Sequence, residues 1–402
     1  MEWTPPRIRR FRDVGLCQSQ HDFAKTLGFE KRTIGNAERG AHPPGLALRR
    51  ALDQALERAS DIQRARFLAA EDQSVASPAH GTFPALGVTA AASLRTFPVT
   101  SYADTAYLET VQQHTLQIIE LDGRFGGTDL APLAVRFFRS VHQQLGSGAY
   151  EPSLERDLQA AAGELAEVAG WLLYDADRQD DVRRLNQEAL YFCRLAGDRS
   201  MEVFTLQNAS MHAGFLGRPQ EALYLARSVL ESGDRLSPRV KMLFLMRKAR
   251  ALAQGGDEQA LTLFDQARSH YQDGVRDADP KWAWWVDERE LAWQEGMALV
   301  DLGHAREAVG KFEQSVAATA PRRVRSRYLH LGYLLGSQVR VGAWSDAETT
   351  MRQIGAMVGD VASTRTEVLL SRTLPELRRE HVPGSTRETA EQLTLLLSQA
   401  IA

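Results

Sequence analysis

The chain lacks the features on which several classes of protein depend. Its 402 residues include only two cysteines, Cys17 and Cys193, which lie far apart in the sequence. They provide neither a disulfide framework nor a zinc site, and such sparse cysteine is typical of the reducing cytosol. No run of about 18 uninterrupted apolar residues occurs, so no membrane-spanning helix is predicted. The first residues lack the apolar core of a signal peptide. We therefore expect a cytoplasmic protein.

Catalytic and nucleotide-binding motifs are also missing. The sequence has no G-x-S-x-G, no H-E-x-x-H, no Walker-type Gly-Lys-Ser/Thr and no G-x-G-x-x-G after a strand. Gly123–Gly127 lacks the strand and the lysine of a phosphate-binding loop, and it indicates a connection between helices. The ten histidines are scattered, and none forms a pair at i and i+4. We expect a protein that is not an enzyme and that uses no metal and no cofactor.

Charge is distributed unevenly along the chain. The net charge is only −3, but the first 70 residues hold 13 Lys and Arg against 8 Asp and Glu. The remaining residues hold 35 against 43. A basic head on an acidic body suits a head that contacts a polyanion and a body that does not.

Composition and periodicity predict three zones. Residues 1–70 are dense in helix signals, and 71–101 is a linker rich in Ala, Ser, Thr and Pro. From 102 to 402, apolar residues recur at i, i+3, i+4 and i+7 and strand-like alternation is scarce, so this body is helical. The fold class expected is all-α.

Two short helices joined by a glycine turn are predicted in the head. Ser19 is a good N-cap for a helix over Gln20–Leu27, and Gly28 permits the sharp turn that follows. A second helix is predicted from about Lys31 to Arg39, ended by Gly40. Flanking helices are expected from Pro5 to about Val14, at Leu46–Leu56, and from Ser60, where Gln63 completes a capping box.

The segment Ser19–Arg39 resembles the helix-turn-helix of the Xre family of phage-repressor-like regulators. Ala24, Gly28 and Ile34 stand at the motif's small, turn and branched-apolar positions, within Gln20-His21-Asp22-Phe23-Ala24 and Arg32-Thr33-Ile34. The resemblance covers about the first 70 residues and implies a five-helix domain that binds DNA. Ala37 departs from it, because a tryptophan is usual there. Gly35 costs about 1 kcal/mol relative to alanine within a helix, and Glu30 is a poor cap.

The motif predicts which side chains meet DNA. With Ile34 and Ala37 inward, the second helix turns Lys31, Arg32, Gly35, Asn36 and Arg39 outward. Arg32 and Asn36 suit guanine and adenine edges in the major groove. Phosphate contacts are predicted for the other candidates, which are Gln20, Lys31, Thr33 and Arg39.

A repeat follows in the body. Gly is followed five residues later by Ala at Gly217, Gly255, Gly303 and Gly342, with a weaker copy at Asp177 and Val182. An apolar residue follows each Ala after one turn. The glycine would end one helix in a left-handed conformation, and the alanine would lie where the next helix crosses it closely. The order resembles the tetratricopeptide repeat and implies a stacked α-solenoid.

In such repeats the first helix of each hairpin lines a concave groove. With each glycine at repeat position 15, the effector groove is predicted to comprise Glu167, Trp171, Tyr174, Gln207, Asn208, Met211, Glu290, Trp293 and Met297. This mixture suits a peptide or an amphipathic small molecule, and its acidic residues favour a cationic group. Asn208 resembles the side chain that clamps a peptide backbone in related peptide-sensing regulators. The alternative is that Trp and Met at helical spacing simply form core.

The sequence therefore predicts a DNA-binding transcriptional regulator whose helical-repeat body senses an effector or a partner protein. A homodimer joined through the body is expected, because two half-sites give the specificity that one head lacks. The alternative is a helical-repeat adaptor that binds a partner protein and whose head does not bind DNA specifically.

Overall fold

A computed structural model of the chain describes residues 3–12, 16, 18–40, 44–59, 102–272, 279–320, 323–379 and 381–401. These residues form helices and no strand, apart from an isolated parallel bridge between Ala103 and Tyr150. The expected all-α class is thereby confirmed. The described residues divide into two compact units. The first contains the residues up to Ala59 with Ser237–Val240 and the described part of His270–Trp285, and the second contains the rest.

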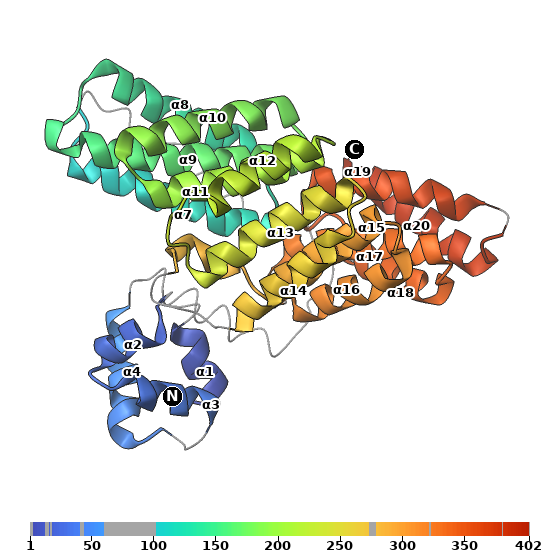
Figure 1. Cartoon of the computed structure of the whole chain (residues 1–402), viewed down its shortest axis with the longest axis horizontal. Coiled ribbons are helices and arrows are strands. Elements are labelled where there is room, and N and C mark those ends of the chain that lie inside the picture. The colour runs from blue at the N-terminus through green and yellow to red at the C-terminus, as the bar shows by residue number, and fades with distance from the viewer. Residues whose placement is uncertain are drawn as a thin grey trace. The chain divides into compact units, whose positions relative to one another are not determined.

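Four helices occupy the start of the first unit, in blue in Figure 1. They are α1 (Pro5–Arg10), α2 (Gln20–Leu27), α3 (Lys31–Arg39) and α4 (Leu46–Arg58). The Ser19 hydroxyl accepts a hydrogen bond from the Asp22 amide at 3.1 Å and so caps α2. Gly28 and Gly40 end α2 and α3 with φ of +75° and +71°. The predicted bounds of α2 and α3 are thus confirmed.

The predicted bounds of the flanking helices are confirmed only in part. Helix α1 ends at Arg10 and continues through Phe11 and Arg12 as a wider π-type turn, while its predicted end at Val14 lies outside the described residues. Helix α4 runs two residues beyond the predicted Leu56. The helix expected from Ser60 and the linker 71–101 also lie outside the described residues.

Large apolar side chains from all four helices and from the residues beside them form the core of this N-terminal part. Phe11 and Phe23 meet edge to face with ring centroids 5.9 Å apart, and both are fully buried. Ile34 of α3 is fully buried as well. The core is completed by Trp3, Ile8, Ala24, Leu27, Ala37, Leu48, Leu52 and Ala59. Burying the apolar face of α3 determines which of its side chains remain outside.

The body consists of helices in succession, shown from teal to red in Figure 1. Their bounds are α7 (Thr105–Phe125), α8 (Ala131–Ser147), η3 (Pro152–Leu154), α9 (Glu155–Asp175), α10 (Gln179–Ala196), α11 (Arg199–Phe215), α12 (Pro219–Leu230), α13 (Pro238–Gln254), α14 (Gln259–Gln272), η4 (Lys281–Trp285), α15 (Glu288–Asp301), α16 (Ala305–Ala318), α17 (Val324–Val341), α18 (Trp344–Gly355), α19 (Thr364–Thr373), η5 (Leu374–Arg378) and α20 (Gly384–Ile401). Helix α9 packs on α10, α11 on α12, α15 on α16 and α17 on α18.

The turns between these paired helices follow the predicted repeat with one correction. Gly217, Gly303 and Gly342 have φ of +68°, +87° and +71°. Asp177, the weaker copy, adopts the same left-handed conformation with φ of +57°. In the pair α13–α14 the left-handed residue is Gly256, with φ of +76°. The assignment of that role to Gly255 is wrong by one residue, because two adjacent glycines offer the turn two places.

The small residues of the repeat lie in the interior of the body. Ala222, Ala260, Ala308 and Ala347 are all buried. The apolar residues one turn later, Ala226, Phe264, Phe312 and Met351, are buried too. A Cβ added to Gly296 of α15 would lie 2.9 Å from the Phe312 ring. A hydrogen at this position therefore lets α15 and α16 approach closely.

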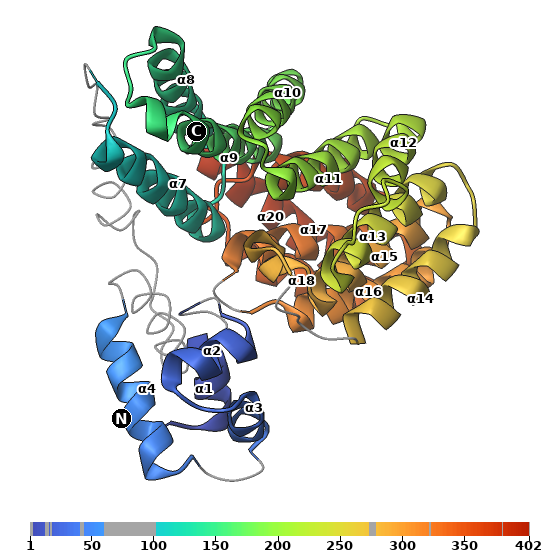
Figure 2. The ribbon, with the colours of Figure 1, turned by 60° about the vertical axis from the view of Figure 1, so that its left-hand side comes forward.

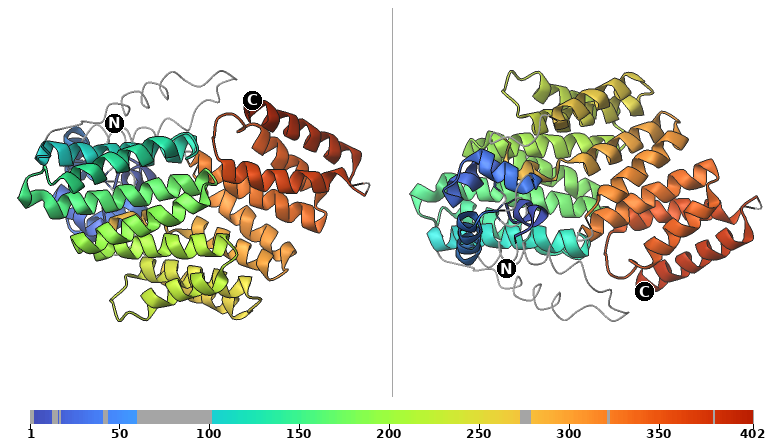
Figure 3. Two further views of the ribbon diagram at one scale, coloured as in Figure 1. Left: turned by 90° about the horizontal axis from the view of Figure 1, so that it is seen from above. Right: turned by 90° about the horizontal axis from the view of Figure 1, so that it is seen from below.

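The end of the body returns to its beginning. Helix α17 contacts α7 and α19 contacts α9, and Figures 2 and 3 show the orange and red helices meeting the teal and green ones. The backbone of Ala362 receives and donates hydrogen bonds across this join: its N–H donates to Phe125 O at 2.8 Å, and its carbonyl accepts from Thr128 N–H at 3.4 Å.

Charged side chains reinforce the join inside the protein. We call Asp122, Trp171, Asp175, Arg325 and Arg365 the closure cluster. Arg325 lies 3.3 Å from Asp122 and 3.8 Å from Asp175, while Arg365 lies 3.5 Å from Asp175. The Trp171 indole donates to Asp122 at 3.1 Å, and the Arg325 guanidinium lies over its ring. Both carboxylates are buried and therefore need these cationic partners.

Candidate functional site

The outward surface of α3 is the first candidate site. Lys31, Arg32 and Thr33 are exposed, and so is Arg39. Asn36 is half-buried, as is Gln20 on the neighbouring helix α2. The six side chains predicted to meet DNA therefore belong to two adjacent, packed helices.

A buried acidic side chain lies behind this surface. The Glu38 carboxylate, whose side chain is 4% exposed, lies 2.6 Å from Arg12 Nε. Arg12 Nη2 donates to it at 3.2 Å, and Gln20 Nε2 donates to it at 2.6 Å. The negative charge of Glu38 is thus compensated inside the unit, and Gln20 is held at the N-terminus of α2. No motif in the sequence marks this pair, which joins residues 26 apart.

Two further details concern the end of α3. Arg39 Nη2 donates to Asn36 Oδ1 at 2.8 Å, so these predicted contacts are bonded to each other. The expectation that Gly35 faces outward is wrong, because Gly35 is buried. A Cβ there would lie 3.6 Å from the Arg39 guanidinium and from Gln20 Oε1, and these two side chains cover it.

The predicted groove residues of the body come from α9, α11 and α15. Most are buried: Glu167, Tyr174, Gln207, Asn208, Glu290 and Trp293. Trp171, Met211 and Met297 are half-buried. A pocket in the second unit is lined by Tyr174, Met211, Trp293 and Met297 from this set. The other five do not line it, and each of them bonds to a neighbouring side chain.

Four of these residues belong to a chain of polar groups that also includes Arg247 and crosses four helices, α9, α11, α13 and α15. Asn208 Nδ2 donates to Glu167 Oε1, and Gln207 Nε2 donates to Asn208 Oδ1. Gln207 Oε1 in turn accepts from Arg247 Nε at 3.1 Å and Nη2 at 2.9 Å. Arg247 Nη2 lies 3.9 Å from Glu290. Burial, with Glu164 nearby, raises the pKa of Glu167 to about 8. The Asn208 amide, which resembles a peptide-clamping side chain in the sequence, is thus already bonded to Glu167 and Gln207.

Several pocket residues were not predicted. They are Ser210, Gly214, Phe215, Ala222, Arg247, Arg250, Ala251, Gln254, Gln294 and Tyr333. Counting the α13 repeat from Gly256 instead of Gly255 shifts its groove positions by one residue. Arg250 then takes the position equivalent to Met211 and Met297. The adjacent pair Gly255-Gly256 is the sequence signal for this alternative register.

The comparisons with known proteins place no family beside these sites. No family model matches the chain, and no curated protein matches it. Among the residues that the structure describes, no group of three or more His, Cys, Asp or Glu side chains is arranged to hold a metal ion. Within the same residues, every helix is too short or too polar to cross a membrane.

Proposed function

We propose that the protein is a sequence-specific DNA-binding transcriptional regulator in which α3 enters the major groove. The observation that carries this proposal is the one-signed outer surface of α3. Lys31, Arg32 and Arg39 are exposed, whereas the carboxylate of Glu38 is buried against Arg12. A helix that presents cations and buries its acid suits a phosphate-lined groove.

The arrangement refines the roles of the end of α3. Bidentate recognition of adenine requires both the Oδ1 and Nδ2 atoms of Asn36. Arg39 donates to that Oδ1 in the absence of DNA. We expect Arg39 to leave Asn36 for a phosphate when DNA binds. This exchange replaces one exposed hydrogen bond by another and so costs little.

The remainder of the proposal assigns regulation to the body. The body binds a peptide, a small molecule or a partner protein, and its helices join two copies of the chain in an α-solenoid that resembles tetratricopeptide repeats. Two heads would then bind two half-sites about one helical turn apart. Analytical ultracentrifugation at micromolar concentration tests the dimer, and a monomer would contradict it.

Selection of bound sites from random DNA tests the function itself. On the selected site, Arg32→Ala and Asn36→Ala should each cost about 1–3 kcal/mol of binding free energy and relax specificity at one position. Lys31→Ala should weaken all sequences and reduce the salt slope by about one. Arg340→Ala is the control, because it removes an exposed arginine from the body. Wild-type protein without salt-dependent DNA binding would overturn the proposal and favour the adaptor.

A further inference from the structure

In the part of the chain that the structure describes, three buried polar atoms without a hydrogen-bond partner belong to residues that line the pocket of the second unit. Within the described residues, Arg247 Nη1, Trp293 Nε1 and Gln254 Oε1 are buried and have no hydrogen-bond partner. All three residues line the pocket. Folded proteins leave few buried polar atoms unpaired. Two donors and one acceptor beside a single cavity indicate that a ligand completes them.

Arg247 determines the charge of that ligand. Its side chain is 3% exposed, and two of its nitrogens donate to Gln207 Oε1. Its nearest carboxylate, Glu290, is 3.9 Å from Nη2 and accepts a hydrogen bond from Gln294 at 2.8 Å. Burial lowers the pKa of the Arg247 guanidinium, so an anion beside Nη1 would stabilise its charged form.

The acidic residues near the pocket do not favour a cationic ligand. Glu167 accepts from Asn208, and its raised pKa of about 8 keeps it largely protonated at neutral pH. Glu290 accepts a hydrogen bond from Gln294 and lies 3.9 Å from Arg247 Nη2. The unpaired N–H groups at the pocket therefore favour an anionic ligand over the cationic group that the acidic residues indicated in the sequence.

We propose that the pocket binds a small organic carboxylate, whose oxygens accept hydrogen bonds from Arg247 Nη1 and Trp293 Nε1. Gln254 Oε1 accepts from an N–H or O–H group of the same molecule. The Gln254 amide is held by donating to Gly214 O at 2.9 Å, which leaves its oxygen for the ligand.

The size of the cavity limits what enters it. Its volume is about 40 Å³, which accommodates a carboxylate group but no folded segment of chain. Three larger apolar side chains also line the pocket: Met211 and Met297 are half-buried, and Phe215 is 39% exposed. An aromatic or apolar body attached to the carboxylate would lie on these side chains. The ligand class is thus an aryl- or alkyl-substituted small acid.

Calorimetry on the full-length chain tests the charge requirement. The probes are indole-3-acetate and phenylacetate, with indole-3-acetamide as the neutral match and tryptamine as the cationic one. We expect saturable binding of the acids, at least tenfold weaker binding of the amide and none of the amine. Equal or tighter binding of the amide or amine would overturn the proposal. So would the absence of saturable binding by both acids up to about 10 mM, which corresponds to a binding free energy of only about −3 kcal/mol.

A glycine-to-alanine pair tests the location. A Cβ at Gly214 would lie 3.2 Å from Gln254 Oε1, whereas one at Gly310 of α16 meets nothing within 4 Å. Gly214→Ala should weaken acid binding at least tenfold, and Gly310→Ala should leave it unchanged, with both variants folded because alanine favours helix. Trp293→Phe removes one donor and keeps a ring, and it should also weaken binding. Wild-type affinity in Gly214→Ala would show that the acid binds elsewhere and overturn the assignment.

This inference rests on the proposed function only in naming its effector. Acid binding is measured without DNA, and DNA binding is measured without acid, so the two failures are distinguishable. If the protein binds the acid but not DNA, the assignment of the pocket holds and the proposed regulatory function is wrong. If it binds DNA but neither acid, the proposed regulatory function holds and the carboxylate ligand is wrong.

Discussion

At the scale of single residues, burial determines the state of Glu167. Its side chain lies in the interior of the body, where desolvation and the nearby Glu164 carboxyl disfavour its ionised form. The pKa rises from an ordinary 4.5 to about 8. The folded protein therefore keeps a proton that the unfolded chain releases across this interval, and the stability contributed by that proton is lost as the pH rises through the folded pKa.

Glu167→Gln should remove this dependence. Glutamine retains an oxygen that accepts from Asn208 but carries no charge. We expect the variant's thermal midpoint to rise relative to wild type as the pH increases from about 4.5 to 8, since each unit of pKa difference is worth about 1.4 kcal/mol. Scanning calorimetry at several pH values measures it, and Glu313→Gln at an exposed site is the control. A difference in midpoint that is constant with pH contradicts the expectation.

Arg12 forms a buried ion pair with Glu38 of α3. Removing one partner of a buried ion pair leaves the other charge uncompensated, at a cost of about 3–5 kcal/mol. Arg12→Met should therefore lower the hydrogen-exchange protection of α2 and α3 in the full chain. Arg32→Met, at an exposed position, should leave that protection unchanged. If both variants show the same hydrogen-exchange protection of α2 and α3, the Arg12–Glu38 pair does not stabilise these helices.

At the scale of helices, the predictions that succeeded depend on signals within about five residues. Ser19, Gly28 and Gly40 define α2 and α3 because caps and left-handed turns are local chemistry. The placement of Gly35 failed, since long side chains from α2 and α3 cover it. Arg250 was missed through a one-residue error in the turn. Local patterns predict helices well, but which side chain faces a pocket depends on exact register.

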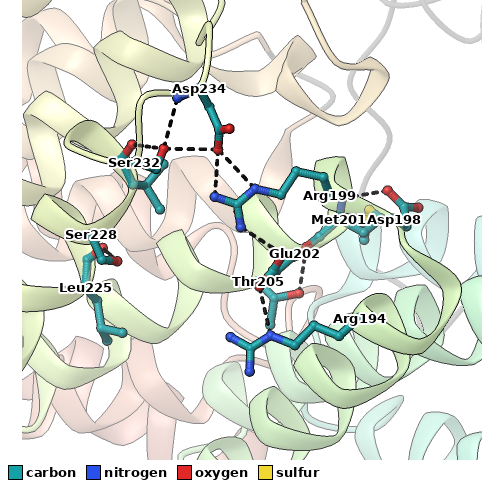
Figure 4. Close-up of polar contacts among 11 residues, drawn as sticks. Arg194, Asp198, Arg199, Met201, Glu202, Thr205, Leu225, Ser228, Ser232 and Asp234 are labelled. Carbon is teal, nitrogen blue, oxygen red and sulfur yellow. Dashed lines mark hydrogen bonds and ion pairs between the residues drawn. The ribbon is translucent and has the colours of Figure 1, made fainter.

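Helix α11 offers a test of one such local signal. Asp198 caps it by accepting from the Met201 amide at 3.0 Å, beside exposed ion pairs of Arg199 with Glu202 and Asp234 (Figure 4). Asp198→Ala should cost about 1 kcal/mol of unfolding free energy in urea. Asp198→Asn should retain most of it. Arg199→Ala should cost less than Asp198→Ala, because exposed pairs are screened by water. A larger loss in Arg199→Ala would show that the ion pairs, rather than the cap, hold this end of α11.

At the scale of the whole second unit, the decisive contacts join segments that lie far apart in the chain. The Thr128 and Thr364 hydroxyls are 3.2 Å apart, although 236 residues separate them. Asp175 Oδ2 accepts from Gly127 N–H at 3.1 Å, and its Oδ1 accepts from Ser363 at 2.9 Å. Nothing periodic in the sequence marks this join, because repeats report contacts between neighbouring hairpins. Gly123–Gly127 was predicted to be a loop between helices, which is wrong for its first three residues because α7 continues to Phe125. The partner of this segment near Ala362 was not predicted.

Gly126 makes the join possible. Its φ of +88° and ψ of +168° belong to a region that only glycine adopts readily. A Cβ there would lie 2.2 Å from the Ala362 carbonyl oxygen. Gly126→Ala should therefore destabilise the unit by about 3 kcal/mol or more, the sum of backbone strain and this overlap.

The pattern of the loss distinguishes the join from a local effect. In Gly126→Ala, amides at the C-terminal end of α7 should lose protection from hydrogen exchange. Amides at the N-terminal end of α19 should lose protection as well, although Thr364 there is 236 residues from its contact Thr128. Gly146→Ala is the matched control, because a Cβ on that glycine of α8 meets nothing within 4 Å. Exchange confined to α7 and α8 would mean that the two ends of the body fold independently. Loss on both sides would mean that closure of the body stabilises its first and last helices together.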